Sequence, residues 1–394
     1  MLRLSVDINA ERMVGRIEQE VPVRRDSPWA GELREAIAEG YKRLLGPSVA
    51  NEVQAQVRAR AEGEAVEVFA TNLTQLLLSA PFGRRRVIGI DPGFRSGCKC
   101  AALSSTGRFL GHTTLFPHTS RQGADEGLVA FVRQYGADAV AVGNGTAGRE
   151  TLDFVRKALA AANIEAIVVS VNESGASIYS ASAIAREEFP DLDLTVRGAI
   201  SIGRRLQDPL AELVKVDPQS LGVGQYQHDV TQRLLEERLG RVVESCVNRV
   251  GVQLDTASAA LLGHVAGIGP VIARRIVEHR DNHGAFASRQ QLLKVKGLGP
   301  KAFEQAAGFL RIRDAANPLD DSAVHPERYA LVRAMAADIG APLHELVGDP
   351  ALAGRVNLER YAEIGTLTVA DIVRELGKPG LDPRETFEPP RFRD

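Results

Sequence analysis

The spacing of apolar residues changes character twice along this chain. Up to about residue 84 they recur at helical intervals, as in "SPWAGELREAIAEGYKRLL", which opens with a Ser-Pro pair typical of a helix start. The short apolar runs "RRVIGIDPG", "SGCKCAALSS" and "GRFLGHTTLFP" follow, and the turn residues between them predict three strands in a hairpin or meander. Beyond residue 215 the helical interval returns and persists to about residue 378.

Helices and strands alternate after the three initial strands. "GADEGLVAFVRQYG" predicts a helix, "DAVAVGNG" a strand, "RETLDFVRKALAAAN" a helix, "IEAIVVSVNE" a strand and "GASIYSASAIAREEF" a helix. The order β-β-β-α-β-α-β-α predicts a mixed sheet with helices on its faces, and it resembles the ribonuclease H-like fold. A last helix, "RGAISIGRRLQDPLAELVKV", should break or kink at Pro209.

A Gly-apolar-Gly-Pro tetrad occurs twice, at residues 267–270 and 297–300, each time before a helical pattern with basic residues. A helix that starts after a glycine turn offers unpaired backbone N–H groups and the positive end of its dipole to a phosphate. Glycine lets the phosphate approach the main chain, and a side chain at Gly269 or Gly299 should both block that approach and strain the backbone. The pair resembles a tandem helix-hairpin-helix, a sequence-independent nucleic-acid binder. The predicted contacts are Gly267, Gly269, Arg274, Arg275, Lys294, Lys296, Gly297, Gly299 and Lys301.

The fold class predicted from these patterns is multidomain, α and α/β. The expected parts are a helical segment at 1–84, a ribonuclease H-like mixed α/β domain at 85–215, a helical connector at 216–255, a tandem helix-hairpin-helix at 256–313, and a helical C-terminal segment with a proline-rich linker at 314–394.

Charge distribution supports a polyanion partner for the glycine hairpins. The chain carries a net charge of −2, yet residues 256–313 contain nine Lys or Arg against three Asp or Glu, giving +6 there and −8 elsewhere. A compact basic module in an acidic protein is typical of local contact with nucleic acid, although a solvated basic face would have the same composition.

Composition narrows the class of protein to which the chain can belong. The 394 residues suffice for two to four domains. No apolar run is long enough to span a bilayer and no signal-peptide core begins the chain, so we expect a cytoplasmic protein without membrane contact. Three cysteines are too few for a disulfide framework. Cys98 and Cys100 alternate within one strand, which predicts buried apolar residues rather than a metal site, and we expect no metal or cofactor.

Polar residues end three strands of the predicted sheet. Asp91, Asn144 and Glu173 follow strands whose carboxyl ends should meet at one edge, where α/β sheets bind ligands. Nucleases of this fold hold two divalent metals with three or four carboxylates. The set falls short here because Asn144 replaces one acid and the last helix begins with Arg197, a cation that would disfavour a second metal. Asp91, Asn144 and Glu173 are therefore expected to be vestiges of a nuclease site.

Several longer segments together resemble the Tex family of transcription accessory proteins. They are "RRVIGIDPGFRSGCK", "AVGNGTAGRET", "SGASIYSASAIAREEFPDLD", "RGAISIGRRLQDPLAELVKVDPQSLGVGQYQHDV", "LLKVKGLGPKAFEQAAGFLRI" and "NPLDDSAVHPERY". The resemblance implies a YqgF-type ribonuclease H-like domain that has lost nuclease chemistry, tandem helix-hairpin-helix motifs, and a C-terminal OB-fold RNA-binding domain. That last domain would follow "EPPRFRD", where this sequence ends, so we expect the sequence to represent the middle of a Tex protein.

Three functions remain open at this point. The favoured one is a non-catalytic, sequence-independent nucleic-acid-binding factor that assists transcription, with RNA or DNA as ligand and RNA polymerase or ribosome-associated machinery as partner. The alternative is a metal-dependent ribonuclease H-like nuclease or junction resolvase that uses Asp91 and Glu173. A third is nucleotide binding, with "GIDPG" and "GNGTAG" bordering a phosphate pocket.

Overall fold

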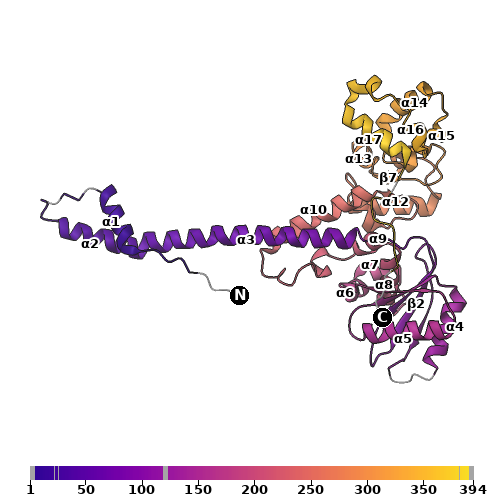
Figure 1. The fold of residues 1–394 in the computed structure, drawn as a ribbon, viewed down its shortest axis with the longest axis horizontal. Coiled ribbons are helices and arrows are strands. Elements are labelled where there is room, and N and C mark those ends of the chain that lie inside the picture. The colour runs from indigo at the N-terminus through magenta and orange to yellow at the C-terminus, as the bar shows by residue number, and fades with distance from the viewer. Residues whose placement is uncertain (1–4, 22, 25, 119–122, 381, 390–394) are drawn as a thin grey trace. The chain divides into compact units, whose positions relative to one another are not determined.

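A computed structural model describes residues 5–21, 23–24, 26–118, 123–380 and 382–389 (Figure 1). Contacts divide the chain into two compact units, one of residues 1–69 with 226–235 and one of residues 70–225 with 236–394. Within the described ranges, no helix combines the length and apolar content that a membrane crossing requires.

The first unit is helical, as the apolar spacing predicts. Helix α1 (Ala10–Glu20) is followed by α2 (Ala30–Gly40), which passes through the π-helical turn η1 (Tyr41–Leu45) into the long α3 (Gly46–Leu77). The side chain of Asn9 caps α1 by accepting a hydrogen bond from the backbone N–H of Arg12. In α3, the carboxylate of Glu62 accepts from the Thr231 hydroxyl, and this bond together with Arg58 lowers the pKa of Glu62.

The second unit contains a five-stranded mixed sheet. Its strands are β1 (Val87–Asp91), β2 (Cys98–Leu103), β3 (Phe109–Leu115), β4 (Ala139–Gly143) and β5 (Ile167–Val171). The order across the sheet is β3-β2-β1-β4-β5, with β1, β2 and β3 antiparallel in turn and β1, β4 and β5 parallel. The mixed sheet confirms the sequence prediction, and its first strand is the central one.

Helices cover both faces of this sheet (Figure 1). Helices α4 (Ala124–Tyr135) and α5 (Gly148–Ala161) pack on the face that carries Ile88 and Ile90, whereas Val87 faces the side covered by α8 (Leu194–Gln207). The alternation within β1 is the period of two that a buried strand shows. Gly89 of β1 and Gly203 of α8 let the two backbones come into contact. A Cβ on Gly89 would lie 2.0 Å from the carbonyl oxygen of Ala199.

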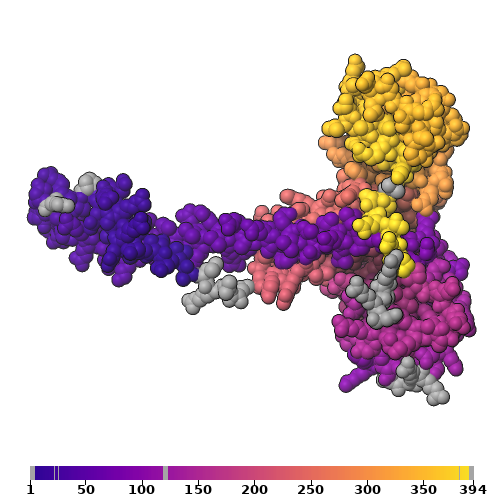
Figure 2. Space-filling view, in the orientation of Figure 1, coloured from indigo at the N-terminus to yellow at the C-terminus, as the bar shows by residue number. Residues whose placement is uncertain are grey.

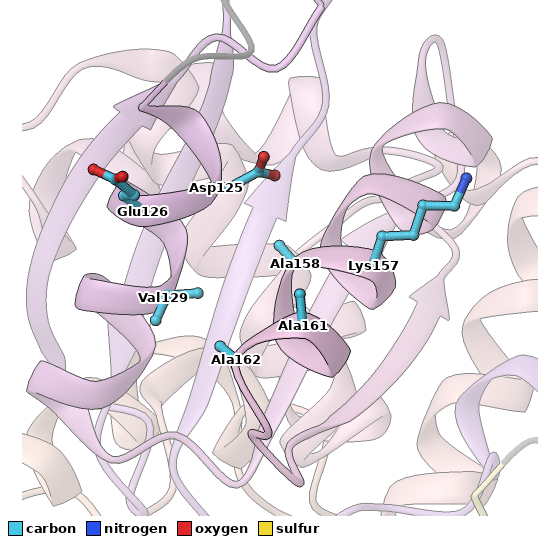
Figure 3. A pocket seen from close by; sticks show the side chains of 7 residues that line it. All are labelled: Asp125, Glu126, Val129, Lys157, Ala158, Ala161 and Ala162. Carbon is cyan, nitrogen blue, oxygen red and sulfur yellow. The ribbon is translucent and has the colours of Figure 1, made fainter.

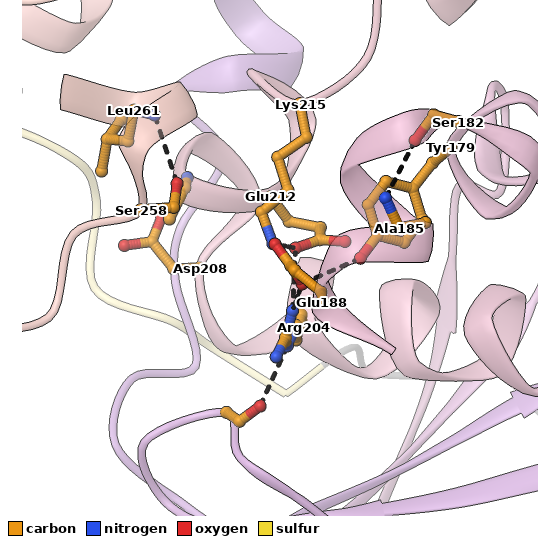
Figure 4. A network of polar contacts seen from close by, with 12 residues as sticks. Tyr179, Ser182, Ala185, Glu188, Arg204, Asp208, Glu212, Lys215, Ser258 and Leu261 are labelled. Carbon is orange, nitrogen blue, oxygen red and sulfur yellow. Dashed lines mark hydrogen bonds and ion pairs between the residues drawn. The ribbon is translucent and has the colours of Figure 1, made fainter. Parts of the chain in front are cut away.

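A partly buried ionic network joins α8 to the helices beside it (Figure 4). It links α7 (Ala183–Glu188), α8 and α9 (Pro209–Leu213), and the break between α8 and α9 falls at Pro209 as predicted. Glu188 accepts from Arg204 at 2.5 Å and from Lys215 at 2.8 Å, and the Lys215 ammonium also lies 2.9 Å from Glu212. The two cations hold the pKa of Glu188 below its ordinary value although burial opposes them. The network therefore fixes α8 against its neighbours.

The helices after residue 231 are mostly short, and the first of them, α10, begins in the first unit and continues into the second. They are α10 (Gln232–Val250), α11 (Ala259–Leu262), α12 (Pro270–His283), η3 (Arg289–Lys294), α13 (Pro300–Ala306), η4 (Pro318–Asp321), η5 (Pro326–Arg328), α14 (Tyr329–Asp338), α15 (Leu343–Leu346), α16 (Pro350–Ala353), η6 (Leu358–Ile364) and α17 (Thr366–Gly377). A parallel bridge between β6 (Val252–Gln253) and β7 (Leu310–Arg311) closes residues 252–311 into a loop. A separate apolar core gathers Val332, Met335, Leu346, Val369 and Leu376 beyond it.

The segment at residues 382–389 has neither helix nor strand, yet its side chains make specific contacts. The Arg384 side chain is almost fully buried and lies 2.6 Å from Asp208, the residue that caps α9, and 2.6 Å from Asp382. Phe387 packs edge-on against Phe82 with ring centroids 5.1 Å apart. The segment, drawn in yellow, lies against the surface of the second unit (Figure 2). The prolines leave this backbone without helix or strand, and the side chains of Arg384 and Phe387 hold it in place.

Candidate nucleic-acid interface

The two glycine hairpins have the same backbone path. Gly267 and Gly297 adopt positive φ angles of 80° and 88°, and the apolar residue after each, Ile268 or Leu298, is only 3% or 4% exposed. Each buried residue anchors its turn to the core, so the glycines on either side stay at the surface. The repeat seen in the sequence is therefore a repeat in structure.

The second glycine of each hairpin is the N-cap of the following helix. Gly269 precedes α12 and Gly299 precedes α13, both with extended backbone at φ −84° and −82°, and neither helix receives a side-chain cap. A Cβ at either glycine would have no protein atom within 4 Å. The predicted backbone strain at these two positions is therefore wrong, because the left-handed conformation belongs to Gly267 and Gly297. The open space in front of the caps agrees with the predicted approach of a phosphate.

Each hairpin packs against the helix of the other. A Cβ on Gly267 would lie 2.8 Å from the Cβ of Gln305, and one on Gly297 would lie 2.4 Å from the Nη1 of Arg275. Gln305 and Arg275 each stand five residues after the proline that starts their helix. Arg275 also donates from Nη1 to the carbonyl oxygen of Lys296 at 3.0 Å. This reciprocal packing relates the two motifs by an approximate twofold, so both helix starts belong to one rigid module.

Only part of the predicted positive charge is available to a ligand. Four of the predicted contacts are exposed cations, namely Arg274, Lys294, Lys296 and Lys301. Arg280 instead donates to the carbonyl oxygens of Leu254 and Ala257, and Arg311 is buried. The net charge of +6 read from the sequence therefore overstates the surface charge, since it counts cations that serve the fold.

Arg289 is the clearest of these structural cations. Its side chain is 1% exposed and donates to the carbonyl oxygens of Leu310 and Val324, each at 2.7 Å, and to that of Ser322. A further bond of 2.8 Å reaches the hydroxyl of Tyr329. Four acceptors from distant parts of the chain converge on one guanidinium, which joins residues 256–313 to the helices that follow.

The sheet brings the three predicted strand-end residues to one edge. Asp91 ends β1, Asn144 follows β4 and Glu173 follows β5, and these strands are parallel neighbours. The side-chain oxygen of Asn144 accepts from the backbone N–H of Glu173 at 3.1 Å. Gly143 and Gly145 make room for the Glu173 carboxylate, because a Cβ on either would lie within 2.2 Å of one of its oxygens.

Two acids with few partners face this edge. Desolvation, then repulsion by Glu173, raises the pKa of Asp91 to about 6, while Lys99 opposes the shift. The Oε2 atom of Glu173 is buried and has no hydrogen-bond partner. In the described part of the chain, no group of three or more His, Cys, Asp or Glu side chains is arranged to hold a metal ion. The edge thus offers two carboxylates and an amide, fewer acidic ligands than a two-metal nuclease uses.

The predicted role of Arg197 at this edge is wrong. Its guanidinium donates to the carbonyl oxygens of Ser180, Phe189 and Pro190 and so braces the chain before α8. The cation that does act on Glu173 is Arg205, whose Nη1 donates to the carbonyl oxygens on either side of it, those of residues 172 and 174, at 2.8 Å each. The sequence offered no signal for this, because Arg205 lies two helical turns beyond the expected position.

A surface hollow of about 430 Å³ lies elsewhere on the sheet domain, between α4 and α5 (Figure 3). Its apolar lining residues are Val129, Ala158, Ala161 and Ala162, and its charged lining residues are Asp125, Glu126 and Lys157. None of the predicted site residues lines it, and its mixture of charges favours no one class of ligand.

Comparisons with known proteins agree with this architecture. The sequence model of the Tex protein YqgF-like domain matches residues 85–207, that of a helix-hairpin-helix motif matches residues 247–311, and that of an HHH domain matches residues 317–384. The last match covers helices that the sequence alone assigns only to a helical segment and linker.

Several known proteins align with most of this chain. Protein YhgF of Escherichia coli is 50% identical over 87% of the chain, and Transcriptional accessory protein Tex of Neisseria gonorrhoeae is 46% identical over 92%. S1 RNA-binding domain-containing protein 1 of Homo sapiens is 36% identical over 92%. The aligned parts make up 45%, 48% and 42% of those proteins, so the chain spans about half the length of its curated relatives. With a Tex YqgF-like domain followed by helix-hairpin-helix domains, and with this identity over most of its length, the chain belongs to the Tex family.

Proposed function

We propose that this chain binds the phosphate backbone of nucleic acid without reading base sequence, as a non-catalytic part of a transcription accessory factor. The matching hairpins carry the proposal, because each presents an exposed glycine at the uncapped start of a helix. Phosphate oxygens accept hydrogen bonds from such N–H groups and are attracted by the positive end of the helix dipole. Contacts of this kind position a strand without reading its bases.

Exposed lysines beside the second hairpin extend the same surface. Lys294 and Lys296 precede its turn, and Lys301 follows Pro300 on the first turn of α13. The names of the relatives support RNA as a ligand and transcription as the setting, so RNA polymerase or ribosome-associated machinery is the proposed partner. Because bacterial transcription takes place in the cytoplasm, the proposal includes that location.

The salt dependence of binding tests the backbone contacts. If about four phosphates are contacted, log affinity should fall against log salt with a slope of roughly −3 to −4. Fluorescence anisotropy with labelled oligonucleotides of unrelated sequence measures the slope directly. Lys301→Ala should weaken binding to every sequence and make the slope shallower by about one. An affinity that is independent of salt, or that varies strongly between sequences, would contradict a backbone grip.

Serine substitutions at the two N-cap glycines distinguish an effect on ligand binding from an effect on fold stability. Gly269→Ser and Gly299→Ser place a Cβ and a hydroxyl in the open space before each helix, and serine is at least as good an N-cap as glycine. Both variants should therefore melt like the parent yet bind nucleic acid more weakly. Gly240→Ala is the matched control, since its Cβ also meets nothing within 4 Å but lies on α10. Parent-like binding by the double serine variant would move the interface elsewhere.

Absence of cleavage is the second half of the proposal. It is supported by the ligand set at the sheet edge, where Asp91 and Glu173 bring two carboxylates beside the amide of Asn144. Single-stranded, duplex and branched substrates should stay intact during incubation with Mg²⁺ or Mn²⁺. The nuclease alternative predicts metal-dependent products that disappear in Asp91→Asn.

A further inference from the structure

Three rings stack at the far end of α12, and we call them the ring stack. His279 lies between His283 and Phe286, with centroid distances of 4.3 Å and 5.3 Å and interplanar angles of 20° and 21°. The first pair is one helical turn apart, and Phe286 joins it after the chain reverses at Gly284, whose φ is 86°. The near-parallel planes make one continuous column of aromatic surface.

The column is anchored at one end and exposed at the other. Phe286 is 3% exposed, and its backbone N–H is hydrogen bonded by the carboxylate of Asp255. His279 is half-buried, whereas His283 is exposed. The Nδ1 atom of His283 lies 3.0 Å from the carbonyl oxygen of His279, a distance at which its N–H donates to that oxygen and steadies the ring. The outer ring of the column is therefore held in place and accessible to solvent.

Basic side chains connect this column to the second hairpin. Arg275, His279 and His283 follow one another at intervals of four residues, so they share one face of α12 and span about 12 Å. Arg275 contacts the second hairpin at Lys296. Lys294 lies close enough to His279 for its charge to help lower the pKa of that ring, after desolvation and the charge of His283. All three causes favour a neutral His279 imidazole, which stacks rather than pairs with an anion.

We infer that the ring stack is a platform for an unpaired nucleobase on a strand held at the second hairpin. The inference rests on the proposed function and adds a preference for single-stranded nucleic acid. Every base has a π-face, so stacking on a flat ring tolerates any sequence. Bases inside a duplex already stack on their neighbours and cannot reach the ring. The His283 ring therefore selects for unpaired strands, while the hairpins contact the phosphates of both single-stranded and duplex nucleic acid.

The test compares single-stranded and duplex oligonucleotides of one sequence by fluorescence anisotropy, in EDTA so that metal bridging of the histidines is excluded. His283→Ala should weaken single-strand binding by about tenfold, within the range measured for base stacking, and leave duplex binding unchanged. His344→Ala, another exposed histidine, is the matched control and should behave like the parent.

Rescue variants separate stacking from hydrogen bonding and from folding. His283→Phe should restore single-strand binding and His283→Gln should not, while thermal melts confirm that all variants are folded. Equal single-strand binding by the parent and His283→Ala, or rescue by Gln, would overturn the platform but leave the hairpin grip standing. A parent that binds neither oligonucleotide would instead refute the proposed function itself.

Discussion

Replacing Asp91 with Asn tests whether the sheet edge holds an unfavourable charge. Burial and the neighbouring Glu173 carboxylate raise the pKa of Asp91 to about 6, from an ordinary value of 3.8. A pKa difference of about 2 corresponds to about 3 kcal/mol of preference for the neutral carboxyl in the folded state. Asn is neutral and nearly the same shape, so the substitution removes the charge and little else.

The direction of the pH dependence follows from where each state titrates. The carboxyl loses its proton near pH 3.8 in the unfolded chain but near pH 6 in the folded one, so between these values the folded state holds more protons. Stability from this group therefore falls as pH rises through that window and stays low above it. We expect Asp91→Asn to match the parent below pH 4 and to be more stable by up to about 3 kcal/mol at pH 8.

Amide hydrogen exchange in β1 and β4 measures this difference within the sheet domain and avoids a global melt of two units. At pH 8 these amides should exchange up to about 100-fold more slowly in Asp91→Asn than in the parent, and the ratio should approach one near pH 4. Asp191→Asn, at an exposed position before α8, controls for the loss of an ordinary acid. Equal exchange in parent and Asp91→Asn at pH 8 would refute the reasoning.

Three further substitutions test how the second unit is held together. Arg289→Ala leaves several buried carbonyl oxygens without donors and should lower the free energy of unfolding by about 3 kcal/mol or more. Arg274→Ala, at an exposed position, should change that free energy little. Gly89→Ala drives a Cβ into the backbone of α8 and should prevent soluble folding, which expression and circular dichroism would show. Arg384→Ala should free residues 382–389 and speed chymotryptic cleavage after Phe387, and an unchanged cleavage rate would contradict the docking.

Much of the sheet and both hairpins could be predicted because their signals are local. Alternating or continuous apolar runs with Gly and Pro between them determine where β1 to β5 begin and end. Asp91 ends its strand because Pro92 and Gly93 follow at once. Each hairpin depends on four adjacent residues, so its repeat is visible without any knowledge of packing.

Properties that depend on distant parts of the chain could not be predicted. Arg289 looks like a surface cation in sequence, yet its acceptors lie 21 to 40 residues away. A Gly-apolar-Gly pattern does not say which glycine takes the left-handed conformation; the packing of Ile268 and Leu298 decides that it is the first. The stack of His279, His283 and Phe286 needs the chain reversal at the end of α12, which spacing alone does not reveal.

The two candidate sites have opposite electrostatic demands. At the sheet edge a phosphate would meet the carboxylates of Asp91 and Glu173, with Lys99 and Arg205 as the cations that interact with them. The hairpins instead present helix N-termini and exposed lysines, so a polyanion gains there what it loses at the edge. Only a cation bound between Asp91 and Glu173 would reverse that preference. The same cation would keep Asp91 ionised and cancel the expected pH dependence of stability. The hydrogen-exchange measurement and the cleavage assay therefore both test whether a cation binds between Asp91 and Glu173.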